Sequence, residues 1–424
     1  MNIPFVPIIP TPPRSPEEAK RLMRSQISAA DNWAYFDHAA VSPIPRASAE
    51  AMRQFLSEAE TDGDYSWPRW AAAAQKLRLS GAELLHCQPS EIALIPNTTF
   101  GINLIAQGMR WETRRGTPCN VVVLENEFSS NLLPWNCLKE QGIEVRHVPV
   151  AHHGVVDLNQ IRRCIDANTQ IVSASWVGYL SGYRIDLGEL CDLVHAAGSK
   201  LFVDAIQGLG VFPCNLLALD IDFLAADGHK WMMGPEGAGL LFIRERNLDL
   251  LRPMMVGWGS LEGAHTFSTQ GMSLKKNASR FEGGSANHIG QIGLERSIRM
   301  LLDLGCHSGG GVSGTGHSGD GLLGETVLET AFILEEQLRT VGAIVHRDQA
   351  LAKQFGSRLT GIVCFEIPNC DPTDLRNRLI REKVMVSVRH GRLRAAVHAY
   401  NDTSDIDRLI QVMRKSESTS RPVL

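Results

Sequence analysis

The sequence lacks the features that would place it in or across a membrane. No run approaches the roughly 18 consecutive apolar residues of a membrane-spanning helix. The first residues, MNIPFVPIIPTPP, are apolar but broken by proline, and no basic segment precedes them, so we expect no signal peptide. The net charge of −4 gives no indication of nucleic acid or an anionic membrane as a partner.

Paired cysteines are also missing. The nine cysteines stand singly, their number is odd, and no CxxC pair occurs. This usage predicts a reduced, cytoplasmic protein whose thiols are mostly structural. His147, His152 and His153 lie near one another, but no further ligand follows at the spacing of a zinc site, so we expect no metal there.

Short apolar runs bounded by turn residues alternate with helical patterns along the chain. Such alternation indicates βα units and therefore an α/β fold with a mostly parallel sheet. With 424 residues, of which 44% are hydrophobic, the chain can form a large domain and a smaller one. We expect seven strands in the large domain, at residues 91–96, 121–124, 144–150, 171–177, 201–203, 222–226 and 238–243.

A segment rich in glycine and serine, CHSGGGVSGTGHSGDGL, interrupts this pattern at residues 306–322. Such a composition cannot bury a core and is typical of a flexible linker. We therefore divide the chain into an N-terminal arm and helix (1–34), a large domain (35–305), the linker, and a small α+β domain (323–424). Within the arm, Ser15 followed by Glu18 predicts a capped helix over residues 16–30.

The most informative stretch runs from Leu201 to Ile243. Asp204 ends one expected strand, and Lys230 follows the end of the next. Ligands of open α/β sheets bind outside the carboxyl ends of the strands, so both side chains should face one crevice. A lysine together with an acid that keeps a ring nitrogen protonated is the pairing that pyridoxal phosphate (PLP) requires. Taken alone, such a pair is more often surface chemistry.

The motifs VDAIQ (203–207) and DGHKWMMGPEGAG (227–239) closely resemble the cofactor segment of the class V aminotransferase group. That group includes cysteine desulfurases, kynureninase and isopenicillin N epimerase, and the resemblance extends from Tyr35 to Leu409. It implies the PLP-dependent transferase fold type I. It also implies that Lys230 binds the cofactor as a Schiff base and acts as the base, while Asp204 pairs with the ring N–H.

The resemblance assigns further contacts to the cofactor ring. Gln207 would contact the ring oxygen, and His229 would lie near the phosphate or the ring. Tyr179 would supply a hydroxyl where desulfurases commonly have Asn. Phe128 would cover the ring face where desulfurases usually carry His, although an aromatic residue after a strand is more commonly part of a core.

The phosphate contacts are implied in the same way. Thr98 and Thr99 open a helix directly after a strand, where the group has its phosphate cup, although an ordinary threonine N-cap has the same pattern. Ser285 lies in RFEGGSAN, which resembles a segment that reaches the phosphate of the other subunit, so a homodimer with shared sites is implied. Asp227 departs from the group's Ser or Thr, and a carboxylate would repel phosphate unless it is turned away or protonated.

Arg394 matches the arginine that binds the substrate carboxylate in this group, so the substrate should be an α-amino acid or a similar amine bearing a carboxylate. We expect Arg389 and Arg392 on a solvated face. The turn at residues 35–40 resembles one that lies beside the substrate in the group, but it is equally typical of an N-cap loop.

The reaction stays open between epimerisation, C–S lysis and transamination, because fold and family do not settle it. Our leading hypothesis is a PLP enzyme of the epimerase and C–S lyase branch. A cysteine desulfurase is disfavoured, because Arg389-His390-Gly391 runs directly into Arg392 without a cysteine-bearing loop. Cys364, within an apolar run, should be inert. A non-catalytic binding protein is disfavoured because Lys230 and the acid and arginine expected around it are all present.

Overall fold

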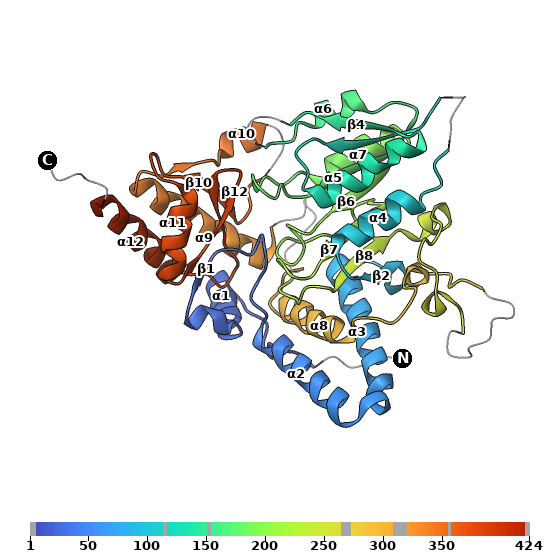
Figure 1. Ribbon diagram of the computed structural model, residues 1–424, viewed down its shortest axis with the longest axis horizontal. Coiled ribbons are helices and arrows are strands. Elements are labelled where there is room, and N and C mark those ends of the chain that lie inside the picture. Colours follow the sequence, from blue (N-terminus) through green and yellow to red (C-terminus); the bar gives the residue numbers. More distant parts are fainter. Residues whose placement is uncertain are drawn as a thin grey trace.

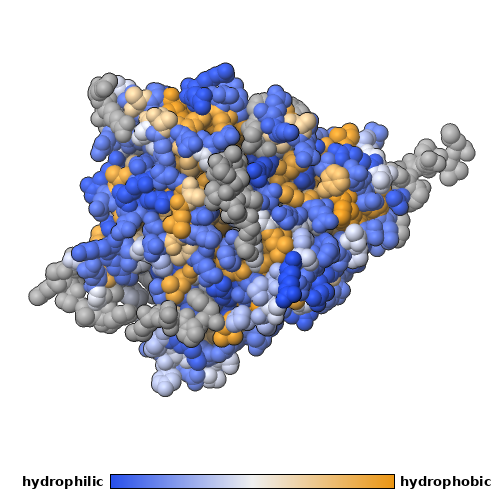
Figure 2. Space-filling model, turned by 180° about the vertical axis from the view of Figure 1, so that it is seen from behind, coloured by the Kyte–Doolittle hydropathy of each residue, from blue (hydrophilic) through white to orange (hydrophobic). Residues whose placement is uncertain are grey.

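The computed structural model describes residues 6–112, 117–150, 154–263, 273–307, 320–354 and 358–419. Figure 1 shows two parts side by side, a larger one built on a seven-stranded sheet and a smaller one that contains the C-terminal elements. Hydrophilic residues predominate on the face shown in Figure 2, with smaller apolar patches among them. In the described part of the chain, no helix has the length and apolar character needed to cross a membrane.

All seven strands expected in the large domain are present. They lie in the order β2-β8-β7-β6-β5-β3-β4. Six of the seven strands run in the same direction and only β8 runs opposite to them, so the prediction of a mostly parallel sheet is confirmed. Their bounds are β2 (Ile92–Ile95), β3 (Asn120–Leu124), β4 (Glu144–Val148), β5 (Thr169–Ser175), β6 (Lys200–Asp204), β7 (Phe223–Asp227) and β8 (Gly239–Ile243).

Both faces of this sheet are buried. Successive strand residues point to opposite faces, and in β3 Val121 and Val123 join one apolar cluster while Val122 and Leu124 join the other. This explains why the strands are continuous apolar runs and not alternating patterns. The first face is covered by α4 (Thr98–Gly108) and α5 (Ser129–Asn136), and the second by α3 (Trp67–Leu85), α6 (Leu158–Cys164), α7 (Leu187–Ala196) and α8 (His288–Asp303).

The smaller part has a four-stranded antiparallel sheet in the order β12-β13-β10-β9. Its helix α9 begins three residues before the expected start at residue 324, and residues 308–319 of the expected linker lie outside the described residues. The sequence did not predict β13. The elements are β9 (Ile344–Val345), β10 (Ile362–Glu366), β12 (Ser387–Arg389) and β13 (Arg392–Ala396), with α9 (Gly321–Thr340), α10 (Gln349–Gln354), α11 (Pro372–Arg381) and α12 (Thr403–Thr419).

The N-terminal elements pack on this smaller part. Helix α1 (Pro16–Ser25) is capped as predicted, because the Ser15 hydroxyl accepts the N–H of Glu18, but it ends five residues before the expected residue 30. It contacts α9, and its Arg24 pairs with Asp405 at 2.8 Å. The next strand, β1 (Ala34–Tyr35), pairs in parallel with β11 (Val384–Met385). Elements from both ends of the chain therefore form the smaller part, while α2 (Arg46–Thr61) packs against α8 of the larger part.

Two buried histidines lie at the junction of the two parts. The rings of His38 and His398 are 5.1 Å apart between centroids, and both lie against Tyr400. His398 donates its Nε2–H to the carbonyl of Trp231 and accepts the N–H of Ala399 at Nδ1. Burial lowers the pKa of His398 to about 4 and that of His38 well below its ordinary value. Both rings are therefore neutral in the folded protein at neutral pH.

This junction makes stability sensitive to acid. The unfolded chain binds a proton at His398 below its ordinary pKa near 6.5, whereas the folded chain does so only near 4, so stability falls as pH drops between these values. We expect His398→Gln to reduce the loss of unfolding free energy between pH 7 and pH 5 by about 2 kcal/mol. Urea unfolding at the two pH values measures this. His147→Gln, which alters an exposed histidine, is the control. An equal reduction of the pH-dependent loss in that variant would contradict the assignment of this loss to His398.

Candidate active site

The ends of β6 and β7 position the two residues on which the PLP prediction depends. These strands are parallel neighbours, and Asp204 ends one of them. After β7, the chain turns at Gly228, where a Cβ atom would lie 2.5 Å from Leu294 Cδ1 and 2.8 Å from the carbonyl oxygen of Ala238. Only glycine fits this approach. The turn brings Lys230 into the same pocket as Asp204, a cavity of about 330 Å³.

Nine of the ten residues singled out from the sequence line this pocket. The exception is Ser285, which is exposed on the loop before α8 and outside the pocket. The resemblance assigns Ser285 to a second subunit's site, so its role stays a prediction. The nine are Thr98, Thr99, Phe128, Tyr179, Asp204, Gln207, His229, Lys230 and Arg394.

Burial shifts the two central ionisable groups toward their neutral forms. It lowers the pKa of Lys230 to about 8, against the charge of Asp204, which favours the ammonium. Burial also raises the pKa of Asp204 to about 6, although its Oδ1 accepts the N–H of Ile206 at 3.0 Å. The Lys230 Nζ lies 5.7 Å from the centroid of the Phe128 ring. A lysine with a lowered pKa is a stronger nucleophile at neutral pH, as Schiff-base chemistry requires.

Arg394 is almost completely buried, with 1% of its surface exposed. Its Nε donates to the Ser387 hydroxyl at 3.3 Å, Nη1 donates to the carbonyl of Tyr179 at 2.8 Å, and Nη2 lies 3.4 Å from Asp37 Oδ1. In the described part of the chain this leaves two of the five guanidinium N–H groups for an anion. The 35–40 turn, whose meaning the sequence left open, thus supplies a partner of Arg394, and Ala39 lines the pocket.

Arg389 corrects one prediction. We expected it on a solvated face, but its half-buried side chain lines the pocket, and its Nη1 donates to the carbonyl of Val388. The reason is the two-residue turn His390-Gly391, in which both residues have positive φ, of 48° and 74°. Such a turn makes a tight hairpin in which Arg389 pairs with Arg392. The positive charge near Lys230 is therefore larger than the sequence suggested.

Two of the expected ring contacts are already engaged within the protein. The Tyr179 hydroxyl lies 2.8 Å from His390 Nε2. Gln207 donates an amide N–H to the carbonyl of Ala39, and its Oε1 accepts the indole N–H of Trp231 at 2.8 Å. Gln207 therefore keeps one amide N–H in the described part of the chain for a further acceptor.

The first turn of α4 forms the other end of the pocket. Asn97 caps the helix by accepting the N–H of Phe100, and Thr99 donates to the hydroxyl of Ser130 at 2.8 Å. The buried Thr98 hydroxyl accepts the backbone N–H of Asp227 at 2.9 Å. The free N–H groups and the positive end of the helix dipole make this end suitable for an anion.

The sequence did not single out Glu127. This buried carboxylate accepts the N–H of Ser175 at 2.6 Å and also bonds its hydroxyl. Burial, reinforced by the charge of Asp204, raises the pKa of Glu127 to about 7. The signal that could have found it is indirect: Ser175 ends β5 and is the register partner of Asp204, so any residue bonded to Ser175 lies beside the pocket.

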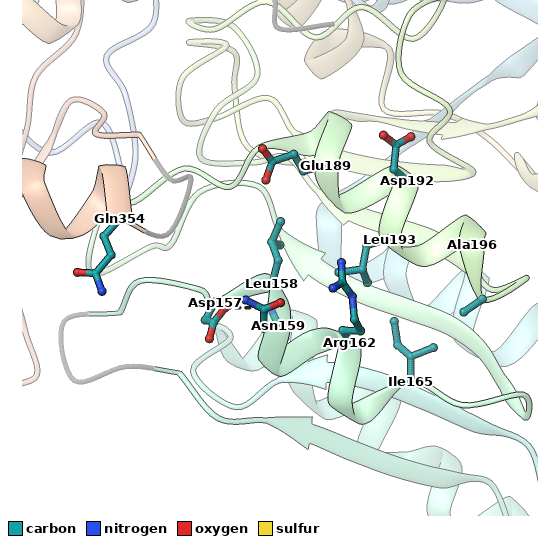
Figure 3. Close-up of a pocket in the computed structure, with 11 residues that line it drawn as sticks. Asp157, Leu158, Asn159, Arg162, Ile165, Glu189, Asp192, Leu193, Ala196 and Gln354 are labelled. Carbon is teal, nitrogen blue, oxygen red and sulfur yellow. Dashed lines mark hydrogen bonds between the residues drawn. The ribbon is translucent and has the colours of Figure 1, made fainter. Parts of the chain in front are cut away.

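A larger groove, of about 960 Å³, lies between α6 and α7 (Figure 3). Polar side chains such as Asp157, Arg162 and Glu189 line it, and it contains none of the predicted site residues. Size alone therefore does not mark the site. Among the described residues, no group of three or more His, Cys, Asp or Glu side chains is placed to hold a metal ion. His152 and His153 lie outside the described residues.

The smaller pocket contains the parts that PLP requires. A buried carboxylate, an amine with a lowered pKa, an aromatic ring and a helix N-terminus all line one cavity of suitable size. The buried carboxylate of Asp204 lacks an ion-pair partner in direct contact within the described residues, and a protonated ring nitrogen would supply one. One group fits less simply, because the Asp227 carboxylate lies at the end of the pocket where a phosphate would bind.

Comparisons with known proteins agree with this fold. A protein named "Probable cysteine desulfurase" from Methanothermobacter thermautotrophicus is 27% identical over 415 residues, which cover 93% of this chain and 97% of the relative. The apo structure of a cysteine desulfurase from Thermococcus onnurineus NA1 is 25% identical and superposes with a TM-score of 0.81, covering 96% of this chain and all of that one.

The cystine C–S lyase C-DES shares the fold, with 19% identity and a TM-score of 0.80 over 92% of this chain and 99% of that one. It was solved in complex with its reaction product, cysteine persulfide, and a mutant with lysine replaced by alanine carries glycine covalently linked to the PLP cofactor. The family model for class V aminotransferases matches residues 34–309. The chain therefore belongs to the class V aminotransferase family, and it is a PLP-dependent enzyme of fold type I.

Proposed function

We propose that the protein is a PLP-dependent lyase that cleaves the C–S bond of a cysteine-type α-amino acid by elimination. The observation that carries the proposal is the buried Lys230 amine, with a pKa lowered to about 8, in one pocket with Asp204 and Arg394. The names of its relatives, cysteine desulfurase and cystine C–S lyase, support a sulfur-containing substrate.

Each side chain then has a defined task. PLP, when bound, supplies an aldehyde for the substrate amine and a ring that takes up the electron pair released at Cα. Lys230 removes the proton from Cα, and the Asp204 carboxylate keeps the ring nitrogen protonated. Arg394 binds the substrate carboxylate with its two remaining N–H groups, and Phe128 covers the ring. With cysteine as substrate, the net reaction with water gives pyruvate, sulfide and ammonia.

The arrangement of thiols favours elimination over a persulfide route. No cysteine lines the pocket in the described part of the chain. Cys364 is buried, its thiol donates to the carbonyl of Leu180, and burial raises its pKa to about 12, so the thiolate is strongly disfavoured. Cys370 follows β10, outside the pocket, with its sulfur 3.3 Å from Arg378 Nη2. We therefore take the relatives' names as a guide to the substrate and not to the mechanism.

Replacing Lys230 tests the site itself. We expect Lys230→Ala to lose the visible absorbance of the lysine-bound cofactor and to lower turnover by several orders of magnitude, because nucleophile and base are lost together. Absorbance spectra and pyruvate release from cysteine or cystine measure this. Lys139→Ala, which alters an exposed lysine, is the control. Turnover by Lys230→Ala at the wild-type rate would show that the site is wrongly assigned.

Replacing the thiols tests the mechanism. Cys364→Ala and Cys370→Ser, singly and together, should release pyruvate from cysteine at rates within about twofold of the wild type, because no thiol takes part. Alanine should not form. Cys137→Ser, an exposed cysteine, serves as the control. Alanine made from cysteine by the wild type and lost in either variant would establish the persulfide route instead.

We further propose that the enzyme is a homodimer in which Ser285 of each subunit contacts the phosphate of the cofactor bound in the other subunit. Ser285 is exposed, and so are the apolar side chains of Met254, Met255 and Val256 on a nearby loop. Exposed apolar side chains of this kind are typical of a surface that a partner subunit covers. Ser285→Ala should weaken cofactor retention about fivefold, the effect of one hydrogen bond of about 1 kcal/mol. Light scattering measures the oligomeric state, and dialysis against buffer measures cofactor retention. Ser57→Ala, which alters an exposed serine, is the control. A fully active monomer would refute this part of the proposal.

A further inference from the structure

Arg389 brings a second guanidinium into the pocket, and the proposed elimination gives it no task. Its Nη1 donates to the carbonyl of Val388 at 2.9 Å, and within the described residues no carboxylate lies at ion-pair distance from it. Four of its five N–H groups are therefore left, in this part of the chain, for another acceptor. A half-buried arginine without a counter-charge is well placed to bind an anion.

The hairpin of β12 and β13 presents Arg389 and Arg394 on one face. Ser387 lies opposite Arg394 in this antiparallel pair, and the Ser387 hydroxyl accepts the Nε–H of Arg394. Arg389 is two residues from Ser387 on the same strand, so both side chains point to the same side of the sheet. Arg389 lies opposite Arg392, two residues from Arg394. Arg389 and Arg394 are thus diagonal neighbours, which lie about 7–8 Å apart in such pairs.

The two arginines differ in depth. Arg394 is 1% exposed and keeps two N–H groups within the described residues, enough for one carboxylate. Arg389 is half-buried, and His390, the next residue toward the turn, is exposed. A substrate whose α-carboxylate binds Arg394 therefore reaches Arg389 with its other end, on the side nearer to solvent.

We propose that Arg389 selects substrates whose leaving sulfur group carries a carboxylate of its own, as in cystine. The inference rests on the proposed C–S lyase function and names its substrate class. The two Cα atoms joined through a disulfide are about 4.4–6.8 Å apart, so the carboxylates on them suit two arginines at diagonal positions. The planar guanidinium of Arg389 binds the second carboxylate through two parallel N–H···O bonds.

The elimination from cystine balances without a further oxidant or reductant. The Cα–H bond breaks and its proton passes to Lys230, while the Cβ–S bond breaks and the sulfur leaves with the electron pair of that bond. From cystine and water, the net products are pyruvate, ammonia and cysteine persulfide. A perthiolate is less basic than a thiolate and leaves more readily. This agrees with the ring of Phe128 near Lys230, which has no proton to give to a leaving group.

The test compares two disulfides as substrates of the holoenzyme: cystine, and the mixed disulfide of cysteine with cysteamine, which lacks only the second carboxylate. The wild type should have a kcat/KM at least about tenfold higher for cystine, measured by pyruvate release. Arg389→Gln should lower kcat/KM for cystine about thirtyfold, mainly through KM, and that for the mixed disulfide less than about twofold. Arg392→Gln is the matched control, because Arg392 lies on the same hairpin, outside the pocket and 3.8 Å from Glu366.

Binding without C–S cleavage gives a second measurement. Diaminosuberate has the skeleton of cystine with two methylene groups in place of the sulfur atoms, and homolysine lacks one of its carboxylates. Calorimetry with the holoenzyme should show that the wild type and Arg392→Gln prefer diaminosuberate by about tenfold or more, whereas Arg389→Gln does not. If Arg389→Gln fails to fold, Arg389→Lys takes its place, with a loss of about fivefold confined to cystine and diaminosuberate, because the charge remains and the fork is lost.

Each other result overturns a defined claim. Equal losses for both disulfides in Arg389→Gln would show that Arg389 serves the shared α-carboxylate or the fold, and an unchanged preference for cystine would exclude it from recognition of the second carboxylate. An equal loss in Arg392→Gln would reduce the effect to general charge. A wild type that releases pyruvate from cysteine but does not prefer cystine would refute this inference alone. Release of pyruvate from none of the three compounds would refute the proposed lyase function itself.

Discussion

The burial of one amine governs this structure. Removing Lys230 from water lowers its pKa, and the nearby charge of Asp204 opposes that effect without cancelling it. The balance depends on the adjacent ends of two parallel strands, on a turn that only glycine can make against Leu294, and on the helix that carries Leu294. The central sheet and its packing thus create a basic side chain whose proton is held less firmly than in water.

The sequence predicted the large sheet well, for a physical reason. Strands covered on both faces must be apolar throughout, and all seven appear as short apolar runs between turn residues. The carboxyl ends of the expected strands also place Asp204 and Lys230 in one crevice, and this prediction needs no information about side-chain packing. Most of what a single sequence predicts about the pocket therefore comes from the residues at the ends of the strands.

The features that the sequence did not reveal depend on contacts between distant segments. Arg389 enters the pocket because a two-residue hairpin with two positive φ angles turns it inward, and nothing in its own neighbourhood distinguishes it from a solvated arginine. Burial, reinforced by the charge of Asp204, raises the pKa of Glu127 to about 7, and neither cause can be read from the residues next to Glu127 in the sequence. The pairing of β1 with β11 joins segments about 350 residues apart, and no local pattern indicates which strand an isolated two-residue strand will join.

The contact between Asp37 and Arg394, which are 357 positions apart, links the order of synthesis to the maturation of the pocket. Asp204 and Lys230 leave the ribosome together, well before the β13 arginine. Domains generally fold as they emerge, N-terminal parts first. The nascent chain therefore contains both strand ends that place Asp204 and Lys230 while Asp37 still lacks its partner. Arg394 is among the last residues of the pocket lining to be synthesised, so the lining is complete only near the end of translation.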